Sequence, residues 1–143
     1  MKFSEISEND WPKLAPYFDT CLLPVTGLTG SENPSETTAA LEQLQIMMDL
    51  VEVPFKGRIV TYPSFHYVSG EDMLAEQLER ICTRLKQTGF RYVVLITADA
   101  RLEKLHVPAA DLLITPIGLP EDYADAKRAV GVQIGELWTR TSD

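Results

Sequence analysis

Four short apolar runs recur along the chain, and most are separated by segments with helical periodicity. The runs are Thr20–Val25, Arg58–Tyr62, Tyr92–Thr97 and Asp111–Ile117. Each ends in a polar, proline-rich or acidic loop, and their composition is typical of strands covered on both faces. The sequence therefore predicts an α/β fold with a mostly parallel four-stranded sheet.

Two segments with apolar residues at three- and four-residue spacings, 34–53 and 71–88, are the predicted connecting helices. Asn33 can cap the first of them, and Glu36 completes a capping box. Gly89 is the predicted left-handed cap of the second. A terminal helix is indicated by an apolar side that contains Tyr123, Ala126, Val130, Ile134, Leu137 and Trp138.

Right-handed crossovers through these helices would place helices on both faces of the sheet and give the strand order 2-1-3-4. A switch point then lies between the first and third strands. The connection at residues 102–110 is short and only weakly helical, so the direction of the fourth strand stays open.

Composition narrows the class of protein. The chain has 143 residues, which fits one domain covering 1–143, and its formal net charge of −8 disfavours nucleic acid as a partner. No apolar run reaches the roughly 18 residues of a membrane span, and Met1–Glu5 lacks the basic start of an export signal. Cys21 and Cys82 have no metal-site spacing and are predicted to be buried free thiols. We expect a cytoplasmic protein without membrane insertion.

The candidate site lies where the strands end, because carboxyl ends of parallel strands share one edge of the sheet. Its candidate ligand- or partner-binding residues are Thr26, Glu32, Ser64, Phe65, His66, Tyr67, Thr97 and Asp99. The loop 26–32 precedes a helix and could hold a phosphate on its backbone N–H groups. It lacks the glycine patterns of nucleotide sites and any Lys or Arg, and Glu32 would repel an anion, so a connecting loop is the favoured interpretation.

Two catalytic arrangements are incomplete at this edge. His66 could act as a base or a metal ligand, but His106 is the one other histidine, and Glu32 and Asp99 have no helical spacing to either. Ser64, His66 and Asp99 have the residue types of a hydrolase triad, but a serine and a histidine two positions apart do not easily make the required contact. The prediction is no catalytic residue, no metal ligand and no cofactor.

Three segments resemble the YpiF family, an uncharacterised group of bacterial proteins of this size: Asp19–Pro24, Phe55–Tyr67 and Gly89–Thr97. The resemblance covers nearly the whole chain. It implies a small cytoplasmic domain, and it carries no known activity.

Other segments are similar to the creatininase family of metal-dependent amidohydrolases: Leu22–Val25 with the glycine-containing loop, Pro34 with Thr37–Ala40, and Gly89–Ile96. This resemblance implies a Rossmann-like, creatininase-like fold of three layers. In that family the first loop supplies Glu, His and Asp metal ligands, and the third strand exits into a histidine between glycines. Here the loop has Glu32 but no histidine, and the third strand exits into Thr97-Ala98-Asp99. The resemblance thus implies a fold without the metal site.

The favoured hypothesis is a non-catalytic cytoplasmic α/β domain that binds a protein partner or a small molecule at the carboxyl edge. A divergent amidohydrolase or other hydrolase that uses His66 with Asp99 or Glu32 is the alternative. A third reading is a homo-oligomer that buries Trp138 and Tyr123. Phe65, Tyr67 and Tyr62 could together form an exposed aromatic patch for a partner, although burial under a neighbouring loop is favoured.

Overall fold

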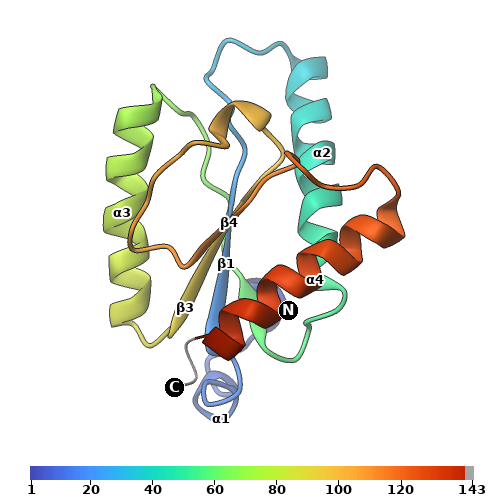
Figure 1. Ribbon diagram of the computed structural model, residues 1–143. Helices are drawn as coiled ribbons and strands as arrows, with labels where there is room; N and C mark the ends of the chain where they lie inside the picture. Colours follow the sequence, from blue (N-terminus) through green and yellow to red (C-terminus); the bar gives the residue numbers. More distant parts are fainter. Residues whose placement is uncertain (141–143) are drawn as a thin grey trace.

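The computed structural model describes residues 1–140 and alternates strands with helices (Figure 1). The elements in chain order are the 3₁₀ turn η1 (Phe3–Glu5), α1 (Trp11–Leu14), β1 (Thr20–Val25), α2 (Pro34–Glu52), β2 (Ile59–Thr61), α3 (Glu71–Gln87), β3 (Tyr92–Thr97), the 3₁₀ turn η2 (Ala100–Leu102), β4 (Leu112–Ile114) and α4 (Tyr123–Arg140). Among these residues, no helix combines the length and apolar character that a membrane crossing needs.

The sheet has the order β2-β1-β3-β4, and all three strand pairs are parallel. The predicted order is confirmed, and the direction of the fourth strand is settled: Val94 lies opposite Leu112 in a parallel register. The two edge strands are shorter than predicted. At the start of β4 the carboxylate of Asp111, rather than a strand carbonyl, accepts a hydrogen bond from the Val93 N–H at 2.9 Å, and Pro116 lacks the N–H that would extend pairing.

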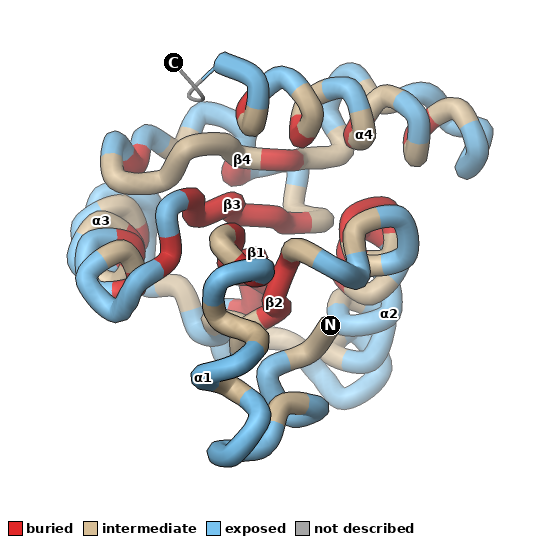
Figure 2. The backbone as a smooth tube through the Cα atoms, turned by 90° about the horizontal axis from the view of Figure 1, so that it is seen from below, coloured by how far each residue is buried: buried red, intermediate tan, exposed pale blue. Residues whose placement is uncertain are grey.

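Each strand sends alternate side chains to opposite faces, and helices cover both faces (Figure 2). On β3, Val94 and Ile96 belong to the cluster formed with α2 and α4, whereas Val93 and Leu95 belong to the cluster formed with α3. Cys21 and Cys82 are free and buried in the second cluster, as predicted. The sheet is therefore the buried middle layer of three layers.

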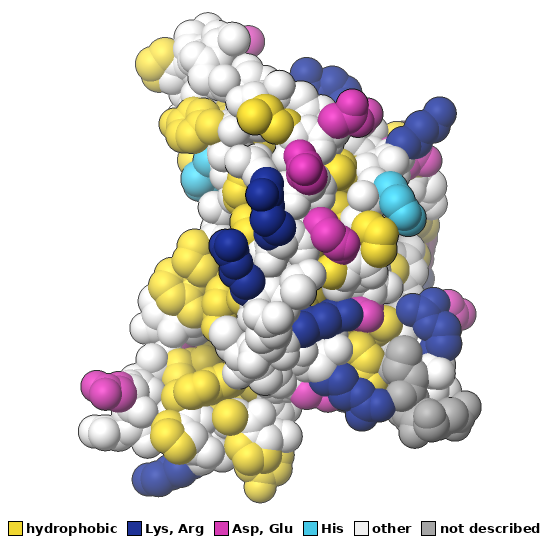
Figure 3. Space-filling model, turned by 90° about the vertical axis from the view of Figure 1, so that its left-hand side faces the viewer, with side chains coloured by type: hydrophobic (Ala, Val, Ile, Leu, Met, Phe, Trp, Pro, Cys, Tyr) yellow, Lys and Arg dark blue, Asp and Glu magenta, His cyan; other side chains and the backbone are white. Residues whose placement is uncertain are grey.

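Local sequence signals explain where the main helices begin and end. The side chain of Asn33 accepts a hydrogen bond from Glu36 N at 2.8 Å, and Glu36 accepts one from Asn33 N at 3.0 Å, so the predicted capping box forms. Helix α3 ends before Gly89, which has a φ of +125°. Its outer face carries interleaved acidic and basic side chains, which Figure 3 shows around the middle of that side of the molecule.

The end of α4 is fastened to the start of β1. The indole N–H of Trp138 donates to Thr20 Oγ1 at 3.0 Å, and the guanidinium carbon of Arg58 lies 3.9 Å from the centroid of the Trp138 ring. Arg58 also forms a bidentate pair with Asp19, with N to O distances of 2.9 and 3.0 Å. The indole of Trp138 is thus used within the chain, whereas Tyr123 is 46 % exposed.

Candidate functional site

The loops that follow β1 and β3 meet at the carboxyl edge of the sheet, at the top of Figure 1, and enclose a cleft of about 310 Å³ with the first turns of α2. The residues that line it are Thr26, Gly27, Leu28, Glu32, Ala39, Ala40, Gln43, Ala98, Asp99 and Arg101. In the sheet, β2 lies on one side of β1 and β3 on the other, so the chain reverses its direction of strand addition between β1 and β3. The cleft therefore lies at the switch point of the sheet. Three of the predicted site residues therefore share one cleft: Thr26, Glu32 and Asp99.

Asp99 reaches the backbone of the β1 loop at Gly27. A Cβ atom built on Gly27 would lie 2.3 Å from Asp99 Oδ2 and 3.1 Å from its Cβ and Cγ atoms. Gly27 also has a φ of +79°, a backbone conformation that favours glycine. Glycine at this position lets the carboxylate sit against the loop, and both residues line the cleft.

Arg101 holds the Asp99 carboxylate in place. Its Nη2 and Nε atoms lie 2.7 and 3.0 Å from Asp99 Oδ2 and Oδ1, and the Arg101 backbone N–H donates to Oδ1 at 3.0 Å. The Asp99 side chain is only 14 % exposed and that of Arg101 is 75 % exposed. The hydrogen bonds from Arg101 outweigh burial and lower the pKa of Asp99, so the carboxylate stays ionised at neutral pH.

The guanidinium of Arg101 still offers donors to the cleft. An arginine carries five N–H groups in a planar fork, and Asp99 engages those on Nε and Nη2. Hydrogen bonds to Asp99, and then the charges of Asp99 and Glu32, raise the pKa of Arg101, so Glu32 also acts on this guanidinium. The pair therefore presents a guanidinium that Asp99 orients and that keeps N–H groups beyond those engaged by Asp99.

Glu32 folds back onto its own loop. Its carboxylate accepts hydrogen bonds from Thr29 N at 3.1 Å and Gly30 N at 2.9 Å, and from the Thr29 hydroxyl at 3.1 Å. These bonds, led by that from Thr29 N, lower the pKa of Glu32. The loop amides that could hold a phosphate are thus occupied by a carboxylate of the chain itself, which agrees with the connecting-loop interpretation.

The exit of β2 is tied to the same edge through Thr26. Its backbone N–H donates to the Phe65 carbonyl at 3.0 Å, and its hydroxyl lies 3.1 Å from His66 Nδ1 and 3.3 Å from the Phe65 carbonyl. Thr26 is buried at the wall of the cleft, and its hydroxyl fixes the exposed imidazole of His66. Phe65 packs into the core cluster below α3.

The remaining predicted residues lie outside the cleft lining. Thr97 is buried, and its hydroxyl accepts from Asp99 N at 3.1 Å. Tyr67 is 65 % exposed with a φ of +65°, and burial of this ring under a neighbouring loop is therefore wrong. Ser64 lines a different hollow, next to Leu41 and Thr61. Because Asp99 is paired with Arg101, no contact joins Ser64, His66 and Asp99 as a triad within residues 1–140.

Over the described part of the chain, no three or more His, Cys, Asp or Glu side chains are grouped so that they could hold a metal ion.

Arg101 is the site residue that the sequence reasoning missed. Asp99 and Arg101 are separated by one alanine directly after the central strand. Two opposite charges so close together in the loop after a strand could have predicted that they form an ion pair. The prediction considered Asp99 as a partner for histidines and left the adjacent cation out. The structure shows that the short 3₁₀ turn η2 lets Arg101 fold back on Asp99.

The model of the family described as a protein of unknown function (DUF2487) matches residues 9–136. This chain belongs to that family. It is also 24 % identical over 99 residues to the "Uncharacterized protein YpiF" of Bacillus subtilis (strain 168), a match that covers 69 % of this chain and 66 % of the relative, just under two thirds of it. No solved structure matches the chain significantly.

The two findings bear out the YpiF resemblance. Neither is a match to the creatininase family, and that similarity stays a prediction.

Proposed function

We propose that this chain is a non-catalytic binding domain that takes a small carboxylate-bearing molecule in the cleft at the carboxyl edge of its sheet. The observation that carries the proposal is the Asp99–Arg101 pair at the mouth of that cleft. Asp99 balances and orients the guanidinium, and the remaining donors of Arg101 match the two oxygens of a carboxylate. The charge of Glu32 opposes an anion in this cleft, but hydrogen bonds from the Thr29 and Gly30 amides and the Thr29 hydroxyl hold that carboxylate against its own loop.

The position of the cleft supports this function. Ligands of open α/β sheets bind outside the carboxyl ends of the strands at a switch point. The volume of about 310 Å³ lies near the lower end of the range of about 300–1,000 Å³ that is usual for small-molecule pockets, so the ligand is small. Leu28, Ala39 and Ala40 supply the apolar part of the lining.

The location that we propose is the cytoplasm. Cys21 and Cys82 are both free and buried, which is the usual state of thiols in a reducing compartment. Burial raises the pKa of Cys82 to about 11, so this thiol stays protonated and unreactive at neutral pH.

A titration of the ¹⁵N-labelled chain with succinate, followed at the Arg101 backbone amide, tests the proposal. Succinamide, which has the same length and no charge, is the neutral control ligand, and sodium chloride keeps the ionic strength constant. We expect the amides of Gly27 and Arg101 to shift with succinate. Arg101→Lys keeps the positive charge but loses the planar guanidinium with its paired N–H donors. It should weaken succinate binding about three- to tenfold, which corresponds to one hydrogen bond.

Arg128→Lys is the matched control variant. Arg128 has a side chain that is 74 % exposed and also pairs with an aspartate, Asp125, but it lines none of the hollows described here. Succinate binding that is equal in R101K and R128K, or equal binding of succinamide, would refute the proposal. A peptide with a free C-terminal carboxylate that competes with succinate would point to a protein as the source of the same group.

A further inference from the structure

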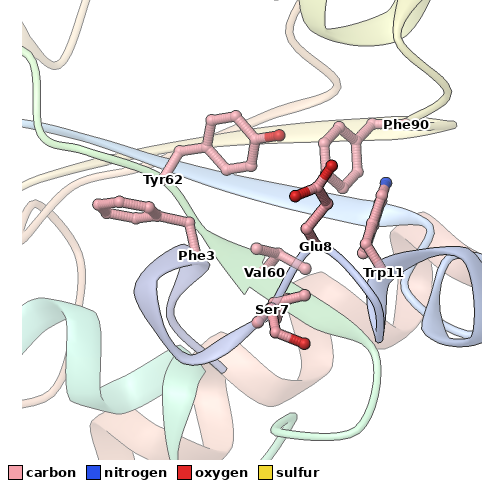
Figure 4. A pocket seen from close by; sticks show the side chains of 8 residues that line it. Phe3, Ser7, Glu8, Trp11, Val60, Tyr62 and Phe90 are labelled. Atoms are coloured by element: carbon pink, nitrogen blue, oxygen red, sulfur yellow. The ribbon is translucent and has the colours of Figure 1, made fainter.

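A second hollow, of about 220 Å³, lies between the N-terminal segment and the β2 edge of the sheet and is distinct from the carboxyl-edge cleft (Figure 4). Four aromatic side chains dominate its lining: Phe3, Trp11, Tyr62 and Phe90. Val60 and the acidic residue Glu8 also line it. Figure 3 shows hydrophobic side chains gathered at the lower left of that view, over the N-terminal segment.

The aromatic rings form a continuous wall. Tyr62 and Phe90 meet edge to face with centroids 5.3 Å apart and an angle of 88° between the rings. Trp11 lies 6.1 Å from Phe90, and Phe3 lies 6.4 Å from Tyr62. Phe90 is buried, Trp11 and Tyr62 are partly buried and Phe3 is exposed, so the ring surface that a ligand could reach belongs mainly to Phe3, Trp11 and Tyr62.

Glu8 is the one charged residue of the lining. Figure 4 shows its carboxylate directed toward the rings of Tyr62 and Phe90. Within residues 1–140 no cation pairs with it, unlike Asp19, Asp99, Asp111 and Asp125, each of which has an ion-pair partner. The hollow therefore combines electron-rich ring faces with an unneutralised negative charge, and both attract a cation.

We propose that this aromatic hollow binds the head group of a small quaternary ammonium compound. Cation–π attraction is strongest for a cation that sits over several ring faces. A quaternary ammonium carries no N–H group and so leaves no donor unsatisfied against apolar walls. A primary ammonium is strongly hydrated and would have to exchange that hydration for its three N–H donors against Glu8 and the hydroxyls of Ser7 and Tyr62, which are the acceptor side chains of the lining.

The chain offers a built-in reporter for this site. It has two tryptophans, Trp11 in the wall of the hollow and Trp138 at the end of α4, where its indole N–H is bonded to Thr20. The two indole N–H signals of a ¹⁵N-labelled sample can be followed separately. We expect choline chloride to shift the Trp11 signal and to leave the Trp138 signal in place, with sodium chloride as the ionic-strength control.

The neutral control ligand is 3,3-dimethyl-1-butanol, which replaces the choline nitrogen by carbon and keeps its shape. Choline should bind about fivefold more tightly or better, because the cation–π and carboxylate attractions are lost in the neutral compound. Equal binding of the two compounds, or no shift of Trp11 with choline, overturns the proposal. A peptide that carries trimethyllysine and shifts Trp11 more strongly than choline supports the site and identifies a modified protein as its source of the group.

Glu8→Gln removes the charge from an exposed position, so it should not disturb folding. It should weaken choline binding about two- to fivefold and leave the butanol unaffected. Glu42→Gln, an exposed position on α2 outside all the hollows described, is the matched control and should bind like the wild type. Choline binding that is unchanged in E8Q, or weakened equally in both variants, contradicts the role assigned to Glu8.

Discussion

Replacement of Gly27 by alanine tests whether the close approach of Asp99 to the β1 loop shapes the cleft. The added Cβ would lie 2.3 Å from Asp99 Oδ2 and 3.1 Å from Asp99 Cβ and Cγ. Rotation of the carboxylate alone does not relieve the contact with Cβ and Cγ, so the Asp99 side chain or the loop must move. Movement of Asp99 would break its 3.0 Å hydrogen bond from Arg101 N.

Two effects contribute to the expected loss of stability. A non-glycine residue in the left-handed region costs about 1–2 kcal/mol, and the lower entropy of the unfolded chain returns about 0.4–1 kcal/mol. The loss of a charge-assisted hydrogen bond adds about 1–2 kcal/mol once the partial exposure of the pair is allowed for. We expect Gly27→Ala to lower the free energy of unfolding by about 2–3 kcal/mol.

Gly30→Ala is the matched control for the backbone term. Gly30 has a φ of +97° in the same loop, but an added Cβ would meet nothing within 4 Å. Urea unfolding at neutral pH should therefore show a loss of about 0.5–1 kcal/mol for this variant. If both variants lose the same stability, the contact between Gly27 and Asp99 does not constrain the loop. In an Asp99→Ala background the two glycine substitutions should differ less, because the carboxylate is gone.

Two further predictions concern the frame that carries the sites. Partial burial acts to raise the pKa of Asp19, but hydrogen bonds from Arg58 and Thr20 outweigh it, so the pKa lies below its ordinary value in the folded chain. The ionised Asp19 carboxylate therefore stabilises the fold above its unfolded pKa of about 3.9, and this stabilisation is lost as the pH falls toward the folded pKa. Asp19→Asn should make the free energy of unfolding decline less steeply below about pH 4. An unchanged slope in urea unfolding at acid pH would contradict the assignment. Asn33→Ala removes the cap of α2 and should cost about 1 kcal/mol in urea unfolding at neutral pH, whereas Ser31→Ala, just outside the helix, should cost less than half as much.

The arrangement of the sheet was predictable because each strand and helix carries its own pattern. The apolar runs locate β1 and β3 to the residue, and right-handed crossovers leave few orders for four parallel strands. The lengths of β2 and β4 were not predictable in this way. At the start of β4, Asp111 accepts from the Val93 N–H with its side chain where a strand residue would use its carbonyl, a feature that hydrophobicity does not encode.

The candidate site was predicted in part for the same reason. Parallel strands bring their exits to one edge, so Thr26, Glu32 and Asp99 could be grouped from strand positions alone. Which exit residues face the cleft depends on turn geometry. The tight turn η2 brings Arg101 back to Asp99, whereas Tyr67 adopts a left-handed conformation and stays exposed.

The aromatic hollow was beyond such reasoning because its N-terminal residues meet residues about 50 to 90 positions further along the chain. Phe3 and Trp11 lie in an N-terminal segment with little regular structure, and Lys2 reaches β2 through an isolated parallel bridge to Thr61. Tyr62 appears in the sequence as the end of a strand next to Pro63, and nothing local shows that Phe90 will meet it edge to face.

The segment from Tyr62 to Val68 joins the two proposed sites, so its rigidity decides whether they can be tested separately. Tyr62 N donates to Leu22 O at 2.9 Å, Phe65 N to Pro24 O at 2.8 Å, and Val68 N to Leu28 O at 2.7 Å. These bonds hold the segment against β1 and its loop at three points, which resists the transmission of a displacement along it. The response of Trp11 to choline and that of the Arg101 amide to succinate should therefore be independent, and failure of one proposal leaves the other intact.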